Sequence, residues 1–179
     1  MRSPLTLTKS RIEGLSDGVF SITMTLLVMK LEVPEVMHHS SNQEMLGQML
    51  ALWPAFATFV VTFLIAGGFW YLHHITFHSI RHVNGVLLWI DLFFLMFVAL
   101  LPFSAGLMTH LLVHPVSQIF YIGNQVAIAV LLNAHWLYAK RKGLLDPSDS
   151  GFIGSVTRRI ASTAGFFAAC LLVAFLLMA

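Results

Sequence analysis

The sequence predicts an all-α, polytopic membrane protein built as a bundle of transmembrane helices. Of its 179 residues, 58% are hydrophobic and only 10% are charged, whereas an average soluble domain carries about 25% charged residues. Five long apolar stretches approach the roughly 20 residues that a spanning helix needs, and polar breaks separate them. Residues 86–101 lack the alternation of polar and apolar side chains that β-barrel strands require, so helices are favoured.

The expected spans cover approximately residues 12–31, 49–71, 85–108, 116–138 and 160–179. Because there is no internal repeat and no hydrophilic stretch long enough to fold alone, residues 1–179 are expected to form a single transmembrane domain. The net charge of +2 is too small to indicate a nucleic-acid partner. The lone cysteine, Cys170, permits no internal disulfide.

Lysine and arginine residues predict the orientation in the membrane. If the N-terminus and the second and fourth loops share one side, that side holds nine of the ten basic residues: Arg2, Lys9, Arg11, Arg81, Lys140, Arg141, Lys142, Arg158 and Arg159. Lys30 alone remains on the other side. Since cytoplasmic loops carry an excess of Lys and Arg, the N-terminus is expected in the cytoplasm and, with five spans, the C-terminus outside.

The first expected span has polar flanks and one narrow apolar face. At 100° per residue, Ile22, Leu26 and Met29 share that face, whereas Asp17 lies about 140° away from Ile22. Polar flanks are unfavourable against lipid, so this helix is expected in the middle of an assembly. Two interpretations of its apolar stripe remain open, ordinary packing or a functional surface. Asp17 is either a buried anchor that orients the helix or a contact for a transported ion.

Residues Arg11 to Asp17, R-I-E-G-L-S-D, and the helix that follows to Val28 closely resemble a known signature. This is the R-x-x-x-F-S-D motif of the transmembrane protein 175 family, potassium-permeable channels of endolysosomes with bacterial and archaeal relatives. Residues 70–77, W-Y-L-H-H-I-T-F, resemble the family's aromatic-plus-histidine segment. Residues 100–103, L-L-P-F, resemble the end of its third span. The resemblance covers about the first two-thirds of the chain.

The resemblance implies a homotetrameric channel for potassium, with other monovalent cations as further candidates, in the lipid bilayer of a prokaryotic plasma membrane. The first helix would line a central pore, with Ile22, Leu26 and Met29 as its apolar constriction and Thr25 beside it. No T-V-G-Y-G filter is present, so a dehydration barrier would take its place. No cofactor or metal is implied. The residues expected to brace the pore helix are Arg11, Ser16, Asp17, Trp70, His73, His74 and Asp91.

The chain departs from the family pattern at three points. Leu15 replaces the phenylalanine of the motif, and Asp91 stands where the third helix of the family usually has asparagine. Asp91 would add a charge or a shared proton to the network. The family has six helices, so we expect either that the chain is truncated or that this variant lacks the last helix.

Two other classes of function remain as alternatives. Residues 14–18, G-L-S-D-G, match the G-x-S-x-G nucleophile motif, so Ser16 could act in an intramembrane hydrolase with His73, His74 or His135 as base. His74, His78 and His82 recur every four residues and would share one helix face. That face is either a hydrogen-bonded cluster or, together with Asp91, part of a proton or metal carrier. The channel is the interpretation that we favour, and it is not an enzyme.

Overall fold

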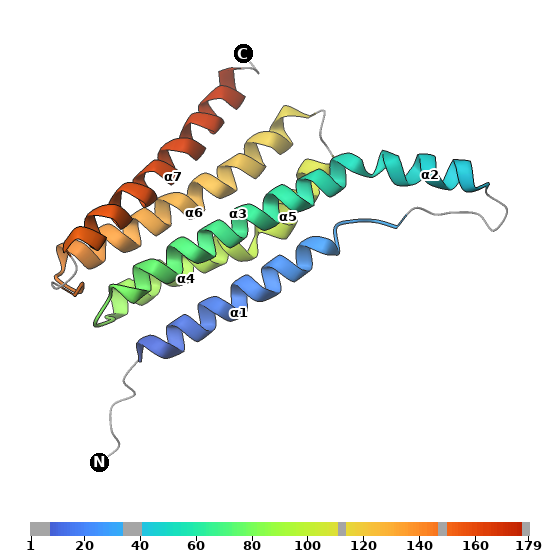
Figure 1. The fold of residues 1–179 in the computed structure, drawn as a ribbon. Coiled ribbons are helices and arrows are strands. Elements are labelled where there is room, and N and C mark those ends of the chain that lie inside the picture. The colour runs from blue at the N-terminus through green and yellow to red at the C-terminus, as the bar shows by residue number, and fades with distance from the viewer. Residues whose placement is uncertain (1–7, 34–40, 111–113, 147–149, 177–179) are drawn as a thin grey trace.

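The computed structural model describes residues 8–33, 41–110, 114–146 and 150–176. Within these ranges the chain is helical, and a single bridge between Ile80 and Leu145 is the only β-type pairing. The all-α expectation is therefore confirmed. The helices are α1 (Lys9–Val28), α2 (Asn42–Ala51), α3 (Trp53–His78), α4 (Gly85–Ala99), α5 (Leu101–His110), α6 (Pro115–Arg141) and α7 (Ser150–Leu176) (Figure 1).

The helix ends follow from local chemistry. Ser41 and Glu44 form a capping box at the start of α2, and the Asn84 side chain accepts a hydrogen bond from the backbone N–H of Leu87 at the start of α4. Prolines stand in the first turns of α3 and α6, where the missing N–H costs nothing. Helices α4 and α5 continue one another across Leu100, two residues before Pro102, which cannot donate to the preceding turn.

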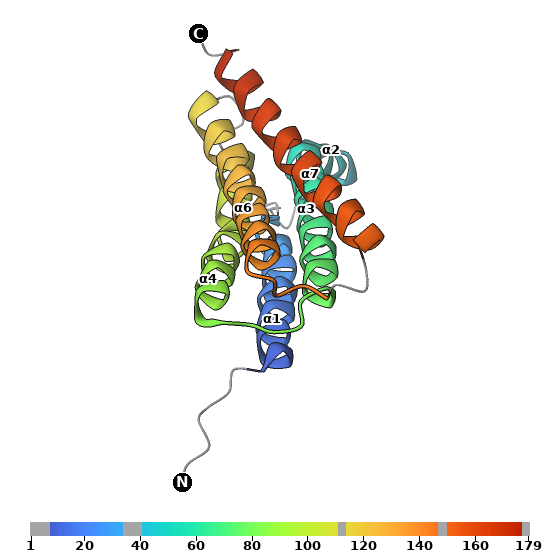
Figure 2. The ribbon, with the colours of Figure 1, turned by 90° about the vertical axis from the view of Figure 1, so that its left-hand side faces the viewer.

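The long helices pack side by side, and α2 projects away from the bundle (Figure 1). Helix α6 pairs with α4, α5 and α7, and α1 packs against α3, α4 and α5. Figure 2 shows α7 lying obliquely across the other helices. The start of α1, the α3–α4 loop and the α6–α7 loop lie at the same end of the bundle (Figure 1). This is the end that carries the described basic residues assigned above to the cytoplasm.

At that basic end, the α3–α4 loop is tied to the α6–α7 loop. The backbone N–H of Arg81 donates to Leu144 O at 2.9 Å, and that of Asp146 donates to Ser79 O at 2.9 Å. The Arg81 guanidinium also pairs with the Asp146 carboxylate, with 3.3 Å between Nε and Oδ2. These contacts fix where α4 and α7 begin relative to each other.

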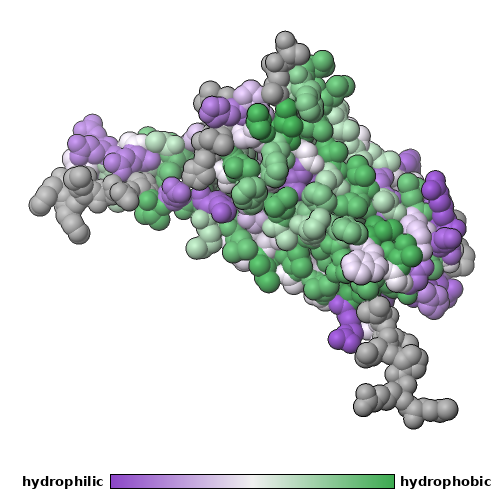
Figure 3. All heavy atoms as spheres, turned by 180° about the vertical axis from the view of Figure 1, so that it is seen from behind, coloured by the Kyte–Doolittle hydropathy of each residue, from purple (hydrophilic) through white to green (hydrophobic). Residues whose placement is uncertain are grey.

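The core is aromatic and aliphatic, and it runs through the middle of the bundle. Trp136, Phe20, Phe69, Phe77 and Phe94 are its largest fully buried side chains. Seen from behind, the surface is mainly apolar over the middle of the bundle, with hydrophilic side chains gathered toward the two ends (Figure 3). An apolar belt between polar ends is the surface that a bilayer requires.

Four helical segments are long and apolar enough to cross a membrane: Trp53–His78, Gly85–Thr109, Pro115–Arg141 and Gly151–Leu176. They correspond to the last four expected spans. Helix α1 is not among them because Lys9, Arg11, Glu13 and Asp17 lie in its first half. Its membrane crossing stays a prediction.

Several helices begin or end at other residues than the expected spans. Helix α3 starts at Trp53 and continues to His78, whereas residues 49–51 belong to α2. Helix α7 starts at Ser150, ten residues before the expected span at 160, and residues 177–179 lie outside the described ranges. Hydropathy marks the apolar part of a helix, whereas backbone hydrogen bonding continues into polar turns such as the one that carries Arg158 and Arg159.

Candidate functional site

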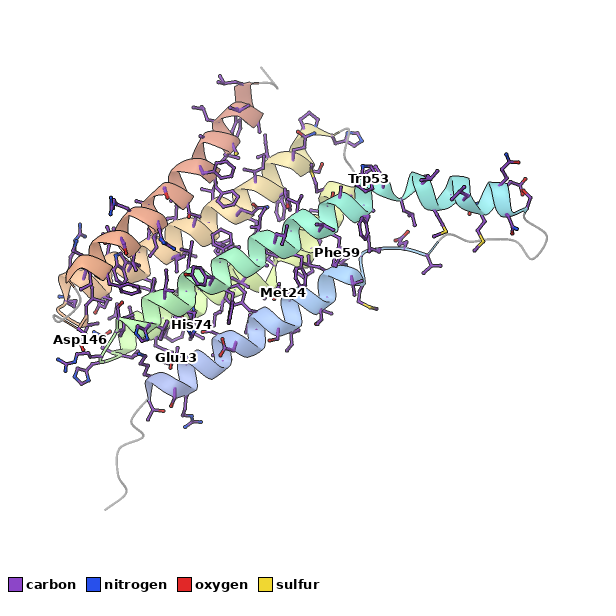
Figure 4. The ribbon with its side chains drawn as sticks, in the orientation of Figure 1. Glu13, Met24, Trp53, Phe59, His74 and Asp146 are labelled. Carbon is purple, nitrogen blue, oxygen red and sulfur yellow. The ribbon has the colours of Figure 1, made fainter. Side chains whose placement is uncertain are left out.

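Helix α1 packs against the rest of the chain through one face. Ile12, Ser16, Phe20, Thr23 and Leu27 are its buried residues, each no more than 2% exposed. They recur every three or four residues, as one face of a helix requires. Phe20 packs in the main core beside Phe94, with 5.9 Å between the ring centroids. Met24 lies between α1 and α3, where Gly67 leaves room for it (Figure 4).

A second stripe on α1 is apolar and largely exposed, and it lies roughly 110° around the helix from the middle of the buried face. The exposed fraction is 61% for Ile22, 47% for Leu26 and 73% for Met29. The stripe that periodicity predicted is therefore the outward face of the helix, not a seam with a neighbouring helix of the same chain. Ordinary packing within one chain therefore does not account for the stripe. The stripe is a surface that faces a partner chain, lipid or a central axis.

Thr25 lies on the exposed side of α1, near the stripe. Its hydroxyl is 2.8 Å from Ile22 O and 3.0 Å from Ser21 O, so its single proton is used within the helix. The hydroxyl oxygen keeps its lone pairs for another donor or a cation.

Ser16, His73 and Asp91 form one buried polar cluster that joins α1, α3 and α4. A hydrogen bond of 2.7 Å joins His73 Nε2 and Asp91 Oδ1, and the Ser16 hydroxyl lies 3.4 Å from Asp91 Oδ2 and 3.0 Å from Ile12 O. The three side chains are 1%, 4% and 1% exposed. The His73 ring also lies flat against Phe94, at 5.1 Å between centroids. Asp91 Oδ1 is therefore paired with His73, and Oδ2 shares the single Ser16 hydroxyl proton with Ile12 O.

Asp17, Trp70 and His74 form a second cluster, between α1 and α3. The Trp70 indole Nε1–H donates to Asp17 Oδ1 at 2.9 Å, and the Trp70 and His74 rings stack at 5.7 Å between centroids. Figure 4 shows His74 on α3 where that helix passes α1. All three residues are exposed within one chain. This cluster joins α1 to α3 at the surface of the chain.

Arg11 does not join either cluster. It is exposed at the start of α1 and makes no side-chain hydrogen bond or ion pair with the residues that the structure describes. Of the expected bracing residues, the structure thus brings together Ser16, His73 and Asp91 in one cluster and Asp17, Trp70 and His74 in another.

Polar side chains of α6 also make contacts with other helices, as polar residues inside an apolar span are expected to do. The Thr62 and Tyr121 hydroxyls are 2.8 Å apart across α3 and α6, and the Asn124 side-chain amide donates to Phe97 O and Ser104 Oγ, both at 3.3 Å. Polar side chains inside apolar stretches indicate that such hydrogen bonds form. The sequence alone does not show which side chains are the partners. His135 is 1% exposed, and neither of its ring nitrogens has a hydrogen-bond partner among the described residues.

The metal-binding interpretation of the histidines was wrong. Helix α3 ends at His78, so His82 lies outside it and cannot share a helix face with His74 and His78. Across the described ranges no group of three or more His, Cys, Asp or Glu side chains is arranged to hold a metal ion.

The nucleophile-elbow interpretation of Ser16 was wrong as well. That motif needs a strand before the serine and a sharp turn that exposes its hydroxyl. Here α1 runs unbroken from Lys9 to Val28, and Ser16 is 1% exposed with its hydroxyl against Ile12 O and Asp91.

Together, the apolar belt and the four membrane-length helices among the described residues define a polytopic integral membrane protein. Comparison with known proteins gives its family. Residues 11–102 match the family described as endosomal/lysosomal potassium channel TMEM175. The chain belongs to this family, as the motif at residues 11–17 predicted. Since it is a family of ion channels, the expectation that the chain is not an enzyme is confirmed.

Individual relatives agree with this assignment. A potassium channel of Streptomyces collinus is 34% identical over 142 residues, which cover 76% of this chain and 68% of that protein. A potassium channel of Chamaesiphon minutus is 29% identical over 164 residues, which cover 88% and 79% of the two chains. The crystal structure of a lysosomal potassium-selective channel TMEM175 homolog from Chamaesiphon minutus superposes with a TM-score of 0.81 at 27% identity, covering 94% of this chain and 87% of that one.

Proposed function

We propose that the chain forms a homotetrameric, potassium-permeable cation channel in which four copies of α1 line a central pore. The observation that carries this proposal is the stripe of Ile22, Leu26 and Met29, which the described residues of the chain leave largely exposed. Four such stripes around one axis would bury each other's apolar side chains, as exposed apolar patches of this kind do at protein interfaces. Potassium as the permeant ion is supported by the bacterial relatives that are named as potassium channels.

Selection in this proposal comes from dehydration. The three side chains recur over seven residues, which is about 10 Å along a helix at 1.5 Å per residue. Rings of apolar side chains over that length expel water, so an ion sheds hydration to pass. Thr25, beside the stripe, offers a hydroxyl oxygen to the partly dehydrated ion.

The two polar clusters hold α1 in place while its other face lines the pore. Ser16 contacts Asp91 of α4, and Asp17 accepts a hydrogen bond from Trp70 of α3, so α1 is fixed against rotation about its own axis. A rotation of 100°, the angle between adjacent residues, would replace the stripe with its polar neighbours. Asp17 and Arg11, which are exposed within one chain, then find further partners on adjoining subunits.

The proposal includes the orientation and the membrane. The basic residues gather at the end of the bundle where α1 begins, which puts the N-terminus in the cytoplasm by the positive-inside rule. The bacterial relatives support the plasma membrane of a prokaryote as the location, and residues 1–179 then act as a single channel domain.

The direct test is a planar-bilayer recording of the purified protein between potassium and sodium solutions. We expect unitary currents whose reversal potential lies closer to the equilibrium potential of potassium than to that of sodium. The mass of the detergent-solubilised assembly, measured by native mass spectrometry, is expected to equal four chains. Saturable flux without unitary currents would instead indicate a carrier, and an assembly of fewer than three chains would leave no ring of α1 helices.

A further inference from the structure

A groove separates α3 from α7 on the outside of the bundle. Its volume is about 470 Å³, within the range of about 300–1,000 Å³ that is typical of small-molecule sites. Its apolar part consists of Ile65, Phe69 and Leu72 from α3 and Phe167 from α7. The Phe69 and Phe167 rings stack at 5.5 Å between centroids and close the groove at its base. Gly68 adds depth, because no atom lies within 4 Å of the place where its Cβ would be.

The polar side of the groove carries one positive charge and no negative charge. It is formed by Arg159, Ser162 and Thr163 of α7, with Tyr71 of α3 opposite. The Ser162 and Thr163 hydroxyls donate to Arg159 O at 2.8 Å and 2.9 Å, so their protons are used within the helix. The Arg159 guanidinium is exposed and has no ion pair with any residue in the described ranges, unlike Arg81, which pairs with Asp146.

The depth of Arg159 suits a lipid headgroup. The His78 and Phe152 rings, 6.3 Å apart between centroids, mark the basic end of α3 and α7. Tyr71 and Arg159 each lie seven residues from that contact, or about 10 Å along their helices. From there an arginine extends its side chain toward the headgroup level, while its methylene stem stays on apolar surface.

We propose that this groove binds one anionic phospholipid from the leaflet at the basic end of the bundle. The Arg159 guanidinium holds the lipid phosphate, and an acyl chain lies along Ile65, Phe69 and Phe167. Charge complementarity selects the occupant, because the groove offers a guanidinium to a phosphate and no carboxylate to the ammonium of a zwitterionic headgroup. Basic pockets between helices on the cytoplasmic side are the usual form of such sites. The proposal rests on the membrane orientation proposed above, but not on ion conduction.

The test compares two adjacent arginines in the full-length assembly. Native mass spectrometry measures how much phosphatidylglycerol or phosphatidylcholine the detergent-solubilised protein retains as each lipid is titrated. Arg159→Gln removes the guanidinium from the groove, and Arg158→Gln makes the same charge change on a neighbour that does not line it. We expect phosphatidylglycerol binding to weaken about tenfold in Arg159→Gln, the effect of losing a charged hydrogen bond, and to stay close to wild type in Arg158→Gln.

A third variant tests the apolar part. Gly68→Leu fits the helix and fills the groove, so it should abolish retention of phosphatidylglycerol without changing the mass of the assembly. Four outcomes would overturn the proposal: equal loss in the two arginine variants, equal binding of both lipids, displacement of the lipid by inorganic phosphate alone, or a changed assembly mass in Arg159→Gln with unchanged lipid binding. The last would mean that a second copy of the chain covers the groove. Since only lipid retention is measured, a failure here is separate from any failure of conduction.

Discussion

The Trp70 indole N–H donates to the Asp17 carboxylate at 2.9 Å and so joins α3 to α1, on the side of α1 that faces away from its exposed apolar stripe. Asp17→Ala removes this hydrogen bond, and because both partners are exposed within one chain the loss is about 0.5–1.5 kcal/mol per subunit. We therefore expect Asp17→Ala to lower the thermal stability of the assembly, measured by size-exclusion chromatography after heating. Asp17→Asn keeps an oxygen acceptor and should lose less.

The contrary result for Asp17 is equally specific. If Asp17→Ala assembled with wild-type stability and changed only the reversal potential between potassium and sodium, Asp17 would face the ions and would not brace the helix.

Asp91 and His73 make the buried pair at the centre of the first cluster. Asp91→Asn keeps an oxygen within reach of His73 Nε2 and removes a buried charge, so we expect unchanged or higher stability against denaturant. Asp91→Ala leaves His73 and Ser16 without their shared partner, and breaking a buried pair typically costs about 3–5 kcal/mol. An equal loss of stability in both variants would show that a hydrogen-bond acceptor at position 91 does not determine the stability of the protein.

His135 offers a stability test in the opposite direction. Its ring stacks on Phe77 at 5.1 Å between centroids, yet neither ring nitrogen has a partner among the described residues. His135→Phe keeps the stacked ring and removes the two unpaired nitrogens, so we expect a gain of about 1–2 kcal/mol in unfolding free energy. Thermal denaturation of the purified protein measures the change. A loss of stability would mean that the imidazole has a polar partner that the bundle supplies in the membrane.

Lys30 directly follows Met29 at the outer end of α1. Its side chain packs over Gly106 of α5, where Lys30 Cδ lies 3.4 Å from the point that a Cβ would occupy. In a tetramer, four such cations near the outer pore mouth repel entering potassium. Lys30→Gln should therefore raise single-channel conductance at about 10 mM salt, where the Debye length is about 30 Å, and change it little at about 1 M, where it is about 3 Å. An equal effect at both concentrations would exclude a charge effect at the mouth.

Local patterns predicted the apolar stripe of α1 better than the contacts that α1 makes with other helices. The spacing of Ile22, Leu26 and Met29 was enough to place them on one face, because the period of a helix is fixed by its geometry. That Ser16 meets Asp91, 75 positions away, depends on how α1 and α4 pack, which no local pattern contains. The stop of α3 before His82 was missed for a related reason, since a four-residue repeat of histidines does not state where the helix ends.

The polar residues of α6 and α7 were the hardest to interpret from the sequence. Arg158 and Arg159 were placed in a loop because charge lowers hydropathy, but in the structure they lie within α7. The groove beside Arg159 combines residues from α3 and α7, which lie far apart in the sequence. Only the fold brings an arginine of one helix to the apolar face of the other.

The most direct test of the proposed pore is a paired recording of Ile22→Asn and Val28→Asn at equal yield of the assembly. Both residues are β-branched and exposed on α1 within one chain, at 61% and 48%, but only Ile22 belongs to the stripe. If the stripes form the constriction, asparagine at position 22 supplies hydrogen bonds to water and ions where an apolar ring stood. Conductance should then rise and potassium-to-sodium selectivity should fall in Ile22→Asn, whereas Val28→Asn should resemble wild type. Unchanged conductance and reversal potential in Ile22→Asn would show that the pore does not run along this face of α1.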